Sequence, residues 1–594
     1  MFLSLLLPAL LLQAAPDTLS PVVVTADRGV VVSRADTVKI TPYAGAAFPL
    51  VGIPSLYIGD YGGAAALKSA SLRGLGSAHT AVYIDGVRVG NLMSGQGDLG
   101  LLDAASYASA VVDYAQNSVS FNTAKPVFNG RPIAGSVRQA GGSFGLWQPY
   151  ARIDFRLSDR ASLSAHLGAE LDRGDFPLAD GTRRTNNDIY RLNGGLDAFG
   201  QTAGGFWQAK AQYTGADRGT PGSLGWPSAD RQTDRAGFVQ GRMQQRFTDV
   251  YTLDLSVKGA IDAMQYQSEW GDSDYAQKEL QLNSAHRFLL LDWLTASLAA
   301  DVQADWLSGS VYNDRRLATV LAAGLALRTG RLKADVALEY EGSFDGSGSS
   351  WNTLSPSADI RLALFGGLDL VAFGRRAFRT PTFNELYYPG YGNPALHPED
   401  AWLTDAGLDW KMKRGGWSFS ASGDFFCNIL KDKIVSAPSE ADPYIWLPYN
   451  VGKVLSLGAD AAAGFGYAAG DWKASLGARY CLQNATDRTP DSYSFGEQIP
   501  YVSRHTVALT AGAGWKGWSL DGAFNLRSGR RDGSGEMPDW STLDASFGKS
   551  FSLGSGMSLE LSMVARNLLN SRYEVIRDYP MPGRSFIVGG TFRF

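Results

Sequence analysis

Two short motifs in the first hundred residues carry charged side chains at a spacing that suits binding rather than bond-making chemistry. Residues 71–74 read SLRG, and residues 81–88 read AVYIDGVR. The Asp85-Gly86 pair favours a tight turn after a buried strand. Arg73 and Arg88 offer guanidinium groups that form strong, often bidentate, ion pairs with carboxylates. The motifs therefore predict a turn and two cationic anchors.

The histidines and cysteines form no recognisable catalytic or metal-binding set. Cys427 and Cys481 belong to no CxxC pair, which argues against a zinc ribbon or a disulfide framework and leaves a single bridge between them open. GxSxG, phosphate-loop and dinucleotide fingerprints are also missing from any convincing context. We therefore predict a protein that is not an enzyme and needs no cofactor. The widely separated histidines, which we interpret as structural, are His79, His166, His286, His397 and His505.

The composition excludes several classes of protein. The 594 residues include 54 Lys and Arg against 58 Asp and Glu, a net charge of −4 that does not suit a nucleic-acid binder. Hydrophobic residues make up 45% of the chain, yet the purest runs, such as residues 317–327, fall far short of the roughly 18 residues of a membrane-spanning helix. Glycine, at 69 residues, and aromatic residues, at 11%, are both abundant. Helical membrane proteins are therefore excluded.

From about residue 140 onward the dominant hydrophobic period is two. Over residues 251–258 the odd positions are apolar and the even positions polar, and residues 518–527 repeat the alternation. Residues 413–416 (KRGG) separate two such runs, 408–412 and 417–421, which predicts a hairpin. Alternation with turn residues between the runs is typical of β-strands. We therefore expect antiparallel strands over more than 400 residues.

A lipid-facing barrel explains this pattern better than a soluble sandwich. In a bilayer every backbone N–H and C=O must be paired within the protein, and a closed sheet is the strand arrangement that achieves this. About 450 residues at roughly 20 per strand and connection give about 22 strands, with outward apolar residues and aromatic ends. A barrel that wide leaks unless it is plugged. The last residues, 586–594, read as a final barrel strand, although a plain core strand is the alternative.

The N-terminal segments have a different texture. Residues 2–12 (FLSLLLPALLL) with small residues after them are typical of a secretory signal, although no Lys or Arg precedes the apolar run. A buried first helix is the alternative, which Pro8 disfavours. Residues 17–28 follow as a short β-prone stretch flanked by proline and charge. Such a strand can add to the sheet of a partner through main-chain hydrogen bonds.

These motifs together resemble the TonB-dependent outer-membrane transporter family. The β-prone head resembles the Ton box, and SLRG with IDGVR resembles the signature of the plug domain. Residues 378–387 with 392–399 resemble a barrel motif, and residues 565–570 with 573–574 and 582–584 resemble the closing hairpin. The residues assigned to the Ton box are Leu19, Val22, Val23, Val24, Thr25 and Ala26, and those assigned to the plug signature are Arg73, Gly74, Asp85, Gly86 and Arg88.

The resemblance implies an all-β membrane protein of about 22 antiparallel transmembrane strands with the plug domain inside the lumen. The expected boundaries are 1–15 for the signal peptide, 16–28 for the Ton box segment, 29–140 for the plug and 141–594 for the barrel. Arg73 and Arg88 would then bridge the plug to acidic groups on the inner wall. The implied location is the outer membrane of a Gram-negative bacterium, with outer-membrane lipid and periplasmic TonB as partners and no nucleic acid.

Within the family the resemblance is greatest to cobalamin transporters. Residues 58–64 and 91–99 occupy the places of their two apical substrate loops. Glycine lets a backbone approach a large ligand, and hydroxyl and amide side chains can bond to amide and phosphate groups. Plain plug turns are the alternative interpretation. The residues expected to bind the ligand are Asp60, Tyr61, Gly62, Asn91, Ser94 and Gln96.

An acidic loop after an early barrel strand raises the possibility of structural calcium, as in external loops of cobalamin transporters. The candidate ligands are Asp172, Asp175 and Asp180, whereas the interleaved Arg183 and Arg184 fit a solvated loop equally well.

The chain departs from the family pattern at two places, and other functions stay open. Residues 113–122 replace a family segment near the end of the plug, and the stretch before Ile58 lacks a clear helix, so we expect a trimmed or rearranged plug. Other candidate functions are a receptor for an iron-siderophore, haem or oligosaccharide, with a surface lipoprotein as lid, an outer-membrane barrel hydrolase, and a passive porin.

Overall fold

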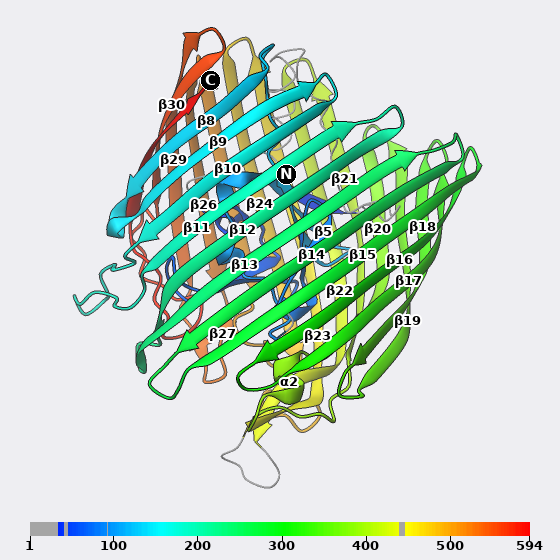
Figure 1. Ribbon diagram of the computed structural model, residues 1–594, viewed down its shortest axis with the longest axis vertical. Helices are drawn as coiled ribbons and strands as arrows, with labels where there is room; N and C mark the ends of the chain where they lie inside the picture. Colours follow the sequence, from blue (N-terminus) through cyan, green and yellow to red (C-terminus); the bar gives the residue numbers. More distant parts are fainter. Residues whose placement is uncertain (1–33, 41–44, 92, 439–445) are drawn as a thin grey trace.

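A closed antiparallel barrel surrounds a small N-terminal domain in the computed structural model, which describes residues 34–40, 45–91, 93–438 and 446–594 (Figure 1). The barrel has 22 strands, and it closes where β31 pairs with β8, with Arg593 opposite Ser136. The predicted fold, an all-β membrane barrel with its plug inside, is therefore confirmed.

The barrel strands run up and down in chain order. Their bounds are β8 Ile133–Gly142, β9 Trp147–Ser158, β10 Ala161–Asp172, β11 Ile189–Gln201, β12 Gly205–Gly222, β13 Pro227–Arg246, β14 Tyr251–Gln267, β15 Ser273–Leu291, β16 Leu294–Gly309, β17 Asp314–Arg328, β18 Leu332–Asp345, β19 Ser350–Phe365, β20 Leu368–Arg379, β21 Glu399–Arg414, β22 Trp417–Pro438, β23 Trp446–Ala469, β24 Trp472–Asp487, β25 His505–Trp515, β26 Trp518–Ser528, β29 Trp540–Gly554, β30 Met557–Arg566 and β31 Ser585–Arg593. The expected hairpin is confirmed, since Arg414 pairs with Trp417.

The strands bury polar side chains and expose apolar ones, the reverse of a soluble sheet. In β15, Glu279 and Gln281 are each 6% exposed, whereas Leu280 is 54% and Leu282 is 48% exposed. Alternation of this kind places polar groups in the lumen and apolar groups against lipid. Aromatic rings gather near the short turns: Trp472 stacks on Trp515 with centroids 5.5 Å apart. The wall is therefore built to sit in a bilayer.

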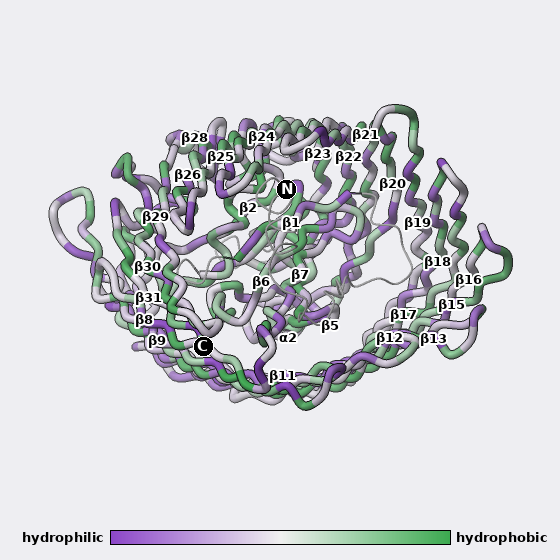
Figure 2. Tube along the Cα trace, turned by 90° about the horizontal axis from the view of Figure 1, so that it is seen from above, coloured by the Kyte–Doolittle hydropathy of each residue, from purple (hydrophilic) through white to green (hydrophobic). Residues whose placement is uncertain are grey.

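The N-terminal domain is a plug of two small sheets inside the lumen (Figure 2). Its apolar core is fully buried, with Leu50, Ile53, Val119 and Phe121 at 0% exposure. The larger sheet has the order β1-β6-β7-β4-β5, and the smaller pairs β2 with β3. The bounds are β1 Ala35–Lys39, β2 Leu56–Asp60, β3 Lys68–Leu72, β4 Ala81–Ile84, β5 Val87–Val89, β6 Tyr107–Asp113 and β7 Ser118–Thr123, with 3₁₀ turns η1 Phe48–Gly52, η2 Ser77–His79, η3 Leu99–Leu101 and η4 Ala104–Ser106.

Helices contribute little to the described part of the chain. The α-helix α2 (Phe383–Tyr387) begins at a capping box in which Thr382 and Glu385 bond to each other's backbone N–H. None of the helices in the described residues has the length and apolar character needed to cross a membrane. The remaining short elements are the 3₁₀ turn η5 Ser143–Gly145 and the loop strands β27 Arg530–Arg531 and β28 Glu536–Met537.

The expected boundary between plug and barrel at residues 140 and 141 is wrong by several residues. The last plug strand, β7, ends at Thr123, and β8 already pairs with β9 and β31 from Ile133 onward. The first barrel strand contains Gly135, Gly141 and Gly142 and so lacks a strong apolar alternation. The glycine content of this strand therefore made its sequence similar to that of the plug.

We predict that Leu282→Arg, at the centre of β15 on the lipid face, lowers the free energy of unfolding in lipid vesicles by about 2–4 kcal/mol. The matched control is Leu290→Arg, because Leu290 is equally exposed but lies beside the short turn, where the cost falls to about 0–1 kcal/mol. Equal losses for the two variants would contradict the lipid-facing orientation of β15.

Candidate ligand cavity and plug anchor

The two ends of the barrel differ in the length of their connections. One end has two-residue turns, such as 366–367 and 415–416, whereas the other has long connections, such as 173–188, 380–398 and 488–504. Outer-membrane barrels have short turns on the periplasmic side and long loops outside. The long connections therefore mark the extracellular end, which lies at the bottom of Figure 1 beside α2.

A cavity of about 800 Å³ opens at this extracellular end, between the plug apex and strands β12 to β16. Four of the six residues expected to bind the ligand line it, namely Tyr61, Asn91, Ser94 and Gln96. The two plug loops, residues 58–64 and 91–99, which only the family resemblance had placed together, therefore meet at one cavity. The ligand-binding role of these side chains stays a prediction.

Local hydrogen bonds fix the shape of the plug apex. The Asn91 side-chain oxygen accepts the N–H groups of Met93 at 2.8 Å and of Ser94 at 3.2 Å. The Gln96 side-chain oxygen accepts the Ser77 hydroxyl at 2.8 Å. Tyr61 meets Tyr579 of the last extracellular loop edge to face, with ring centroids 5.1 Å apart. The apex therefore presents Ser94 and the Tyr61 ring on a backbone held by its own side chains.

Asp60 and Gly62 support the loop and do not line the cavity. Asp60 pairs with the Lys68 ammonium at 3.1 Å and accepts the Gly62 N–H at 2.9 Å. Gly62 has a φ of +89°, and a Cβ there would come within 2.5 Å of the Pro580 carbonyl oxygen. A side chain at this position is therefore excluded both by backbone conformation and by space.

The barrel supplies an aromatic lining that the sequence did not single out. Tyr275 of β15 is buried, whereas Trp226, between β12 and β13, is 78% exposed. The hydroxyl of Tyr266 donates to Asp230 at 2.6 Å. Aromatic residues are frequent throughout this barrel, and the period-two pattern does not tell which of them face the mouth of the lumen. These residues therefore carried no separate signal.

Charges in the cavity are largely paired. Arg218 bonds to Asp98 of the plug and to Asp234 of the wall, each at 2.9 Å. Lys258 bonds to Glu279 at 2.8 Å. The carboxylates on the lining are Asp98, Asp230, Asp234 and Asp262, and the cations among the described lining residues are Arg218, Arg235 and Lys258. The lining therefore suits an amphiphilic ligand of low net charge better than a polyanion.

Arg73 anchors the plug to the opposite side of the barrel, as predicted. Its guanidinium contacts three wall carboxylates, at 2.7 Å from Asp405, 2.7 Å from Asp424 and 3.0 Å from Asp460. It also lies 4.1 Å from the centroid of the Phe426 ring. All four charged side chains are buried. The free-energy cost of removing these charges from water is offset by their charge-assisted contacts in a low dielectric.

The first described residues of the chain join the same cluster. Arg34 bonds to Asp424, and Asp36 pairs with Arg479 of β24 at 3.1 Å. Burial opposes the charged form of Asp36, but Arg479 and Arg34 outweigh it and hold the pKa of this carboxyl below its usual range. The N-terminal end of the plug is therefore tied to the wall by the ion pairs of Arg34 and Asp36. In contrast, burial raises the pKa of Asp113 in β6 to about 6.

Arg88 does not bridge to the wall, which corrects the expectation. Its guanidinium forms no hydrogen bond or ion pair with the described residues, and its side chain is exposed in the lumen. Its carbonyl instead accepts the Lys258 ammonium at 2.8 Å. Within the described part of the chain, none of the wall carboxylates forms an ion pair with Arg88, whereas three do with Arg73. The predicted turn beside it is present, with φ of +50° at Asp85 and +85° at Gly86.

The candidate calcium ligands make separate local contacts. Asp175 pairs with Arg183 at 3.2 Å, the carboxylate of Asp172 accepts the Gly174 N–H, and that of Asp180 accepts from Thr182. Among the described residues there is no group of three or more His, Cys, Asp or Glu side chains that could hold a metal ion. Calcium binding stays a prediction.

The remaining sequence-based assignments have mixed outcomes. The signal and Ton box residues, 1–28, lie outside the described residues. Cys427 and Cys481 are free thiols, so the bridge left open by the sequence is not formed. Among the histidines, His79 lies 2.5 Å from Glu399 of β21, a further contact between plug and wall.

We predict that Arg73→Met destabilises plug docking by about 3–5 kcal/mol, because it leaves the buried carboxylates of Asp405 and Asp460 without their cation and Asp424 with Arg34 alone. The measurement is amide hydrogen exchange in β3 and β4 of the folded protein in detergent. Arg88→Met is the matched control, since this side chain forms no such pairs among the described residues. Equal protection in the two variants would show that the cluster does not hold the plug.

Comparison with known proteins assigns the fold and the family. Residues 27–126 match the family described as TonB-dependent Receptor Plug Domain, and residues 98–568 match TonB dependent receptor-like, beta-barrel. The chain is 23% identical to the vitamin B12 transporter BtuB of Photobacterium profundum over 66% of each chain. It is 22% identical to BtuB of Vibrio vulnificus over 91% of this chain and 88% of that protein.

Among solved structures, the FrpB iron transporter from Neisseria meningitidis superimposes with a TM-score of 0.77, at 13% identity, over 95% of this chain and 99% of its own. This likeness shows the fold alone. The matches to plug and barrel together span most of the sequence. The chain therefore belongs to the TonB-dependent receptor family and is an integral protein of the outer membrane.

Proposed function

We propose that this TonB-dependent transporter imports cobalamin or a related corrinoid, which binds in the cavity between the plug apex and strands β12 to β16. The observation that carries the proposal is the meeting of the two plug loops with an aromatic, nearly charge-balanced wall around about 800 Å³. A corrinoid is bulky, carries many amide groups and has little net charge. Rings and amides suit such a ligand.

The two curated relatives add support, since each is a vitamin B12 transporter, although the identities of 22% and 23% are low. The alternative is an iron-siderophore, haem or oligosaccharide. An anionic chelate favours unpaired cations at its site, whereas two of the three cations among the described lining residues, Arg218 and Lys258, are already paired with carboxylates. A surface lipoprotein that covers the mouth stays a further candidate partner. Membership of a family of transporters and receptors disfavours the alternative of an outer-membrane hydrolase.

The energy for import would come through TonB. The outer membrane holds no nucleotide supply, so work must be delivered from the inner membrane to the Ton box at residues 19–26. These residues would pair with TonB as an added strand. The chain leads from there, within ten residues, to Arg34 and Asp36 in the anchor cluster. Traction on this segment therefore acts first on β1 and its ion pairs.

We predict that Trp226→Ala raises the Kd for cyanocobalamin about tenfold, a loss of roughly 1–2 kcal/mol from an aromatic contact at the cavity mouth. Binding is measured by tryptophan fluorescence or calorimetry on the purified protein in detergent. The control is Trp270→Ala, because Trp270 is 85% exposed on the next loop and does not line the cavity. Failure of the unmodified protein to bind cyanocobalamin would reject the proposed ligand.

We predict that deletion of residues 22–25 abolishes growth on limiting cobalamin in a strain that depends on this transporter, while cyanocobalamin binding to the purified protein is unchanged. The deletion removes the TonB handle and leaves the cavity intact. Growth that survives the deletion would indicate passive diffusion and favour the porin alternative.

A further inference from the structure

Three cavities follow one another from the extracellular end toward the periplasm, between the plug and one side of the barrel. On the periplasmic side of the ligand cavity lies a second cavity of about 290 Å³, and closer still to the periplasm lies a third of about 160 Å³. The first and second share Val82, Gly90, Asn91 and Gln277 among their lining residues, and the second and third share Arg88, Gln303, Ala318 and Val320. Each cavity is therefore the neighbour of the next and is separated from it by the residues that the two share.

Their order follows the direction of transport. Strand β15 runs from the extracellular end at Ser273 to the periplasmic end at Leu291. Along it Tyr275 lines the first cavity, Glu279 the second, and residues 281 and 283–285 the third. Strand β16 gives the same order in reverse, with Leu307, Asp305 and Asp301. The three cavities thus descend along β15 and β16 from the outside toward the periplasm.

On the opposite side the plug is in direct contact with the wall. There Arg73 is bound to β21, β22 and β23, and the plug core contacts the wall through Leu403, Leu430 and Val454. Viewed along the barrel, the plug lies nearer to the wall at β23 and β24 than to the wall at β18 and β19 (Figure 2). The lumen is therefore asymmetric, with an anchored side and an open side.

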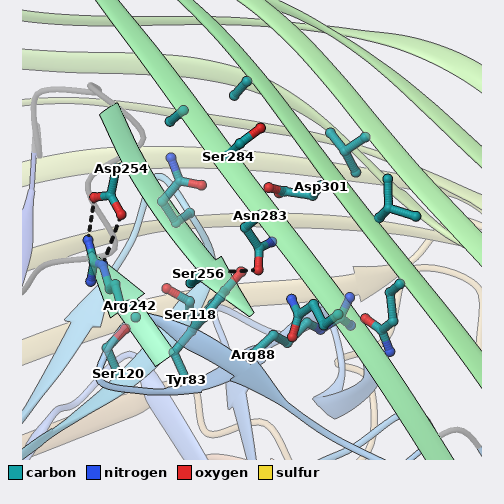
Figure 3. Close-up of a pocket in the computed structure, with 18 of the residues that line it drawn as sticks. Tyr83, Arg88, Ser118, Ser120, Arg242, Asp254, Ser256, Asn283, Ser284 and Asp301 are labelled. Carbon is teal, nitrogen blue, oxygen red and sulfur yellow. Dashed lines mark hydrogen bonds and ion pairs between the residues drawn. The ribbon is translucent and has the colours of Figure 1, made fainter. Parts of the chain in front are cut away.

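The third cavity is lined by polar groups from both plug and wall (Figure 3). Tyr83, Ser118 and Ser120 come from the plug sheet, and Asn283 and Asp301 from the wall. The lining also includes apolar side chains such as Val302 and Val320. The polar groups can hydrogen-bond to water or to a polar solute. Arg88 projects into this space with no ion pair among the described residues. It is therefore available to a passing ligand.

The plug element that borders this side is β5, the free edge of the larger sheet. Three wall side chains hold the β4–β5 hairpin through its backbone carbonyls: Gln240 bonds to Ile84 and Arg242 to Asp85, each at 3.3 Å, and Lys258 bonds to Arg88 at 2.8 Å. Water can replace hydrogen bonds of this kind at small net cost. The hairpin has a further contact with the wall, a longer ion pair between Asp85 and Lys210 at 3.6 Å. Among the described residues it is therefore held by fewer and longer ion pairs than Arg73, which contacts three carboxylates at 2.7–3.0 Å.

We propose that the imported ligand leaves its binding cavity along β15 to β17, through the second and third cavities, and that Arg88 and Ala318 border the constriction between them. This inference rests on the proposed function, because the cavities matter only if a ligand is transported. It assigns Arg88 a role in passage, where the resemblance had implied a structural ion pair.

The test is Ala318→Trp, which fills the junction of the second and third cavities from the wall. The control is Ala462→Trp on β23, a lumen-facing position that lines none of the three cavities. Both variants are compared with the unmodified protein for cyanocobalamin binding in detergent and for TonB-dependent uptake of radiolabelled cyanocobalamin by cells. We expect Ala318→Trp to lower the uptake rate about tenfold or more at unchanged Kd, and Ala462→Trp to leave both unchanged.

The outcomes separate the two proposals. Unmodified protein that neither binds nor imports cyanocobalamin rejects the proposed ligand. Unmodified protein that imports it, with normal uptake by Ala318→Trp, rejects the passage, and so does an equal loss in the two tryptophan variants. If Ala318→Trp does not form a folded barrel, Ala318→Leu and Arg88→Ala take its place, with slower uptake expected from the first and uptake at or above that of the unmodified protein from the second. Slower uptake by Arg88→Ala together with normal uptake by Ala318→Leu would reject the claim that these two residues border a constriction.

Discussion

The requirement that every backbone polar group be paired within lipid determines the rest of this structure. A closed sheet of 22 strands satisfies it, and the alternation of side chains then turns polar groups inward. A polar lumen of this width cannot be filled by apolar packing alone. The plug therefore brings its own apolar core, around Leu50 and Phe121, which also contacts apolar wall residues such as Leu403. Ion pairs add to this contact, with Arg73 among three aspartates and His79 beside Glu399.

That division gives the two sides of the lumen different properties. On the side of β21 to β24, buried ion pairs hold the plug and also bind Arg34 and Asp36, the first described residues after the Ton box segment. On the side of β13 to β17, backbone carbonyls of the plug accept from Gln240, Arg242 and Lys258 of β13 and β14, and cavities remain between the plug and β15 to β17. The ligand cavity lies on the extracellular side of these cavities, where the wall carries aromatic side chains and where Arg218 and Lys258 are paired with carboxylates.

The sequence predicted the barrel, the plug and the turn at Asp85 because period-two alternation and local turn chemistry are encoded by neighbouring residues. Tyr61 and Ser94 were placed at the apex by a different route, the resemblance of their loops to those of cobalamin transporters. The sequence did not distinguish Arg73 from Arg88, because pairing depends on whether wall carboxylates more than 300 residues away, such as Asp405, arrive opposite the guanidinium. The first barrel strand was also placed late, since its glycines mask the alternation.

The position of β1 has a mechanical consequence. This strand is an outer member of its sheet, and its pairing with β6 begins with Ala35 opposite Asp113, next to the Ton box side. A load on Arg34 reaches the Ala35–Asp113 pair before the other pairs of this ladder, because that pair lies at the N-terminal end of β1. The plug sheet is therefore loaded at the end of a strand that has a neighbour on one side only.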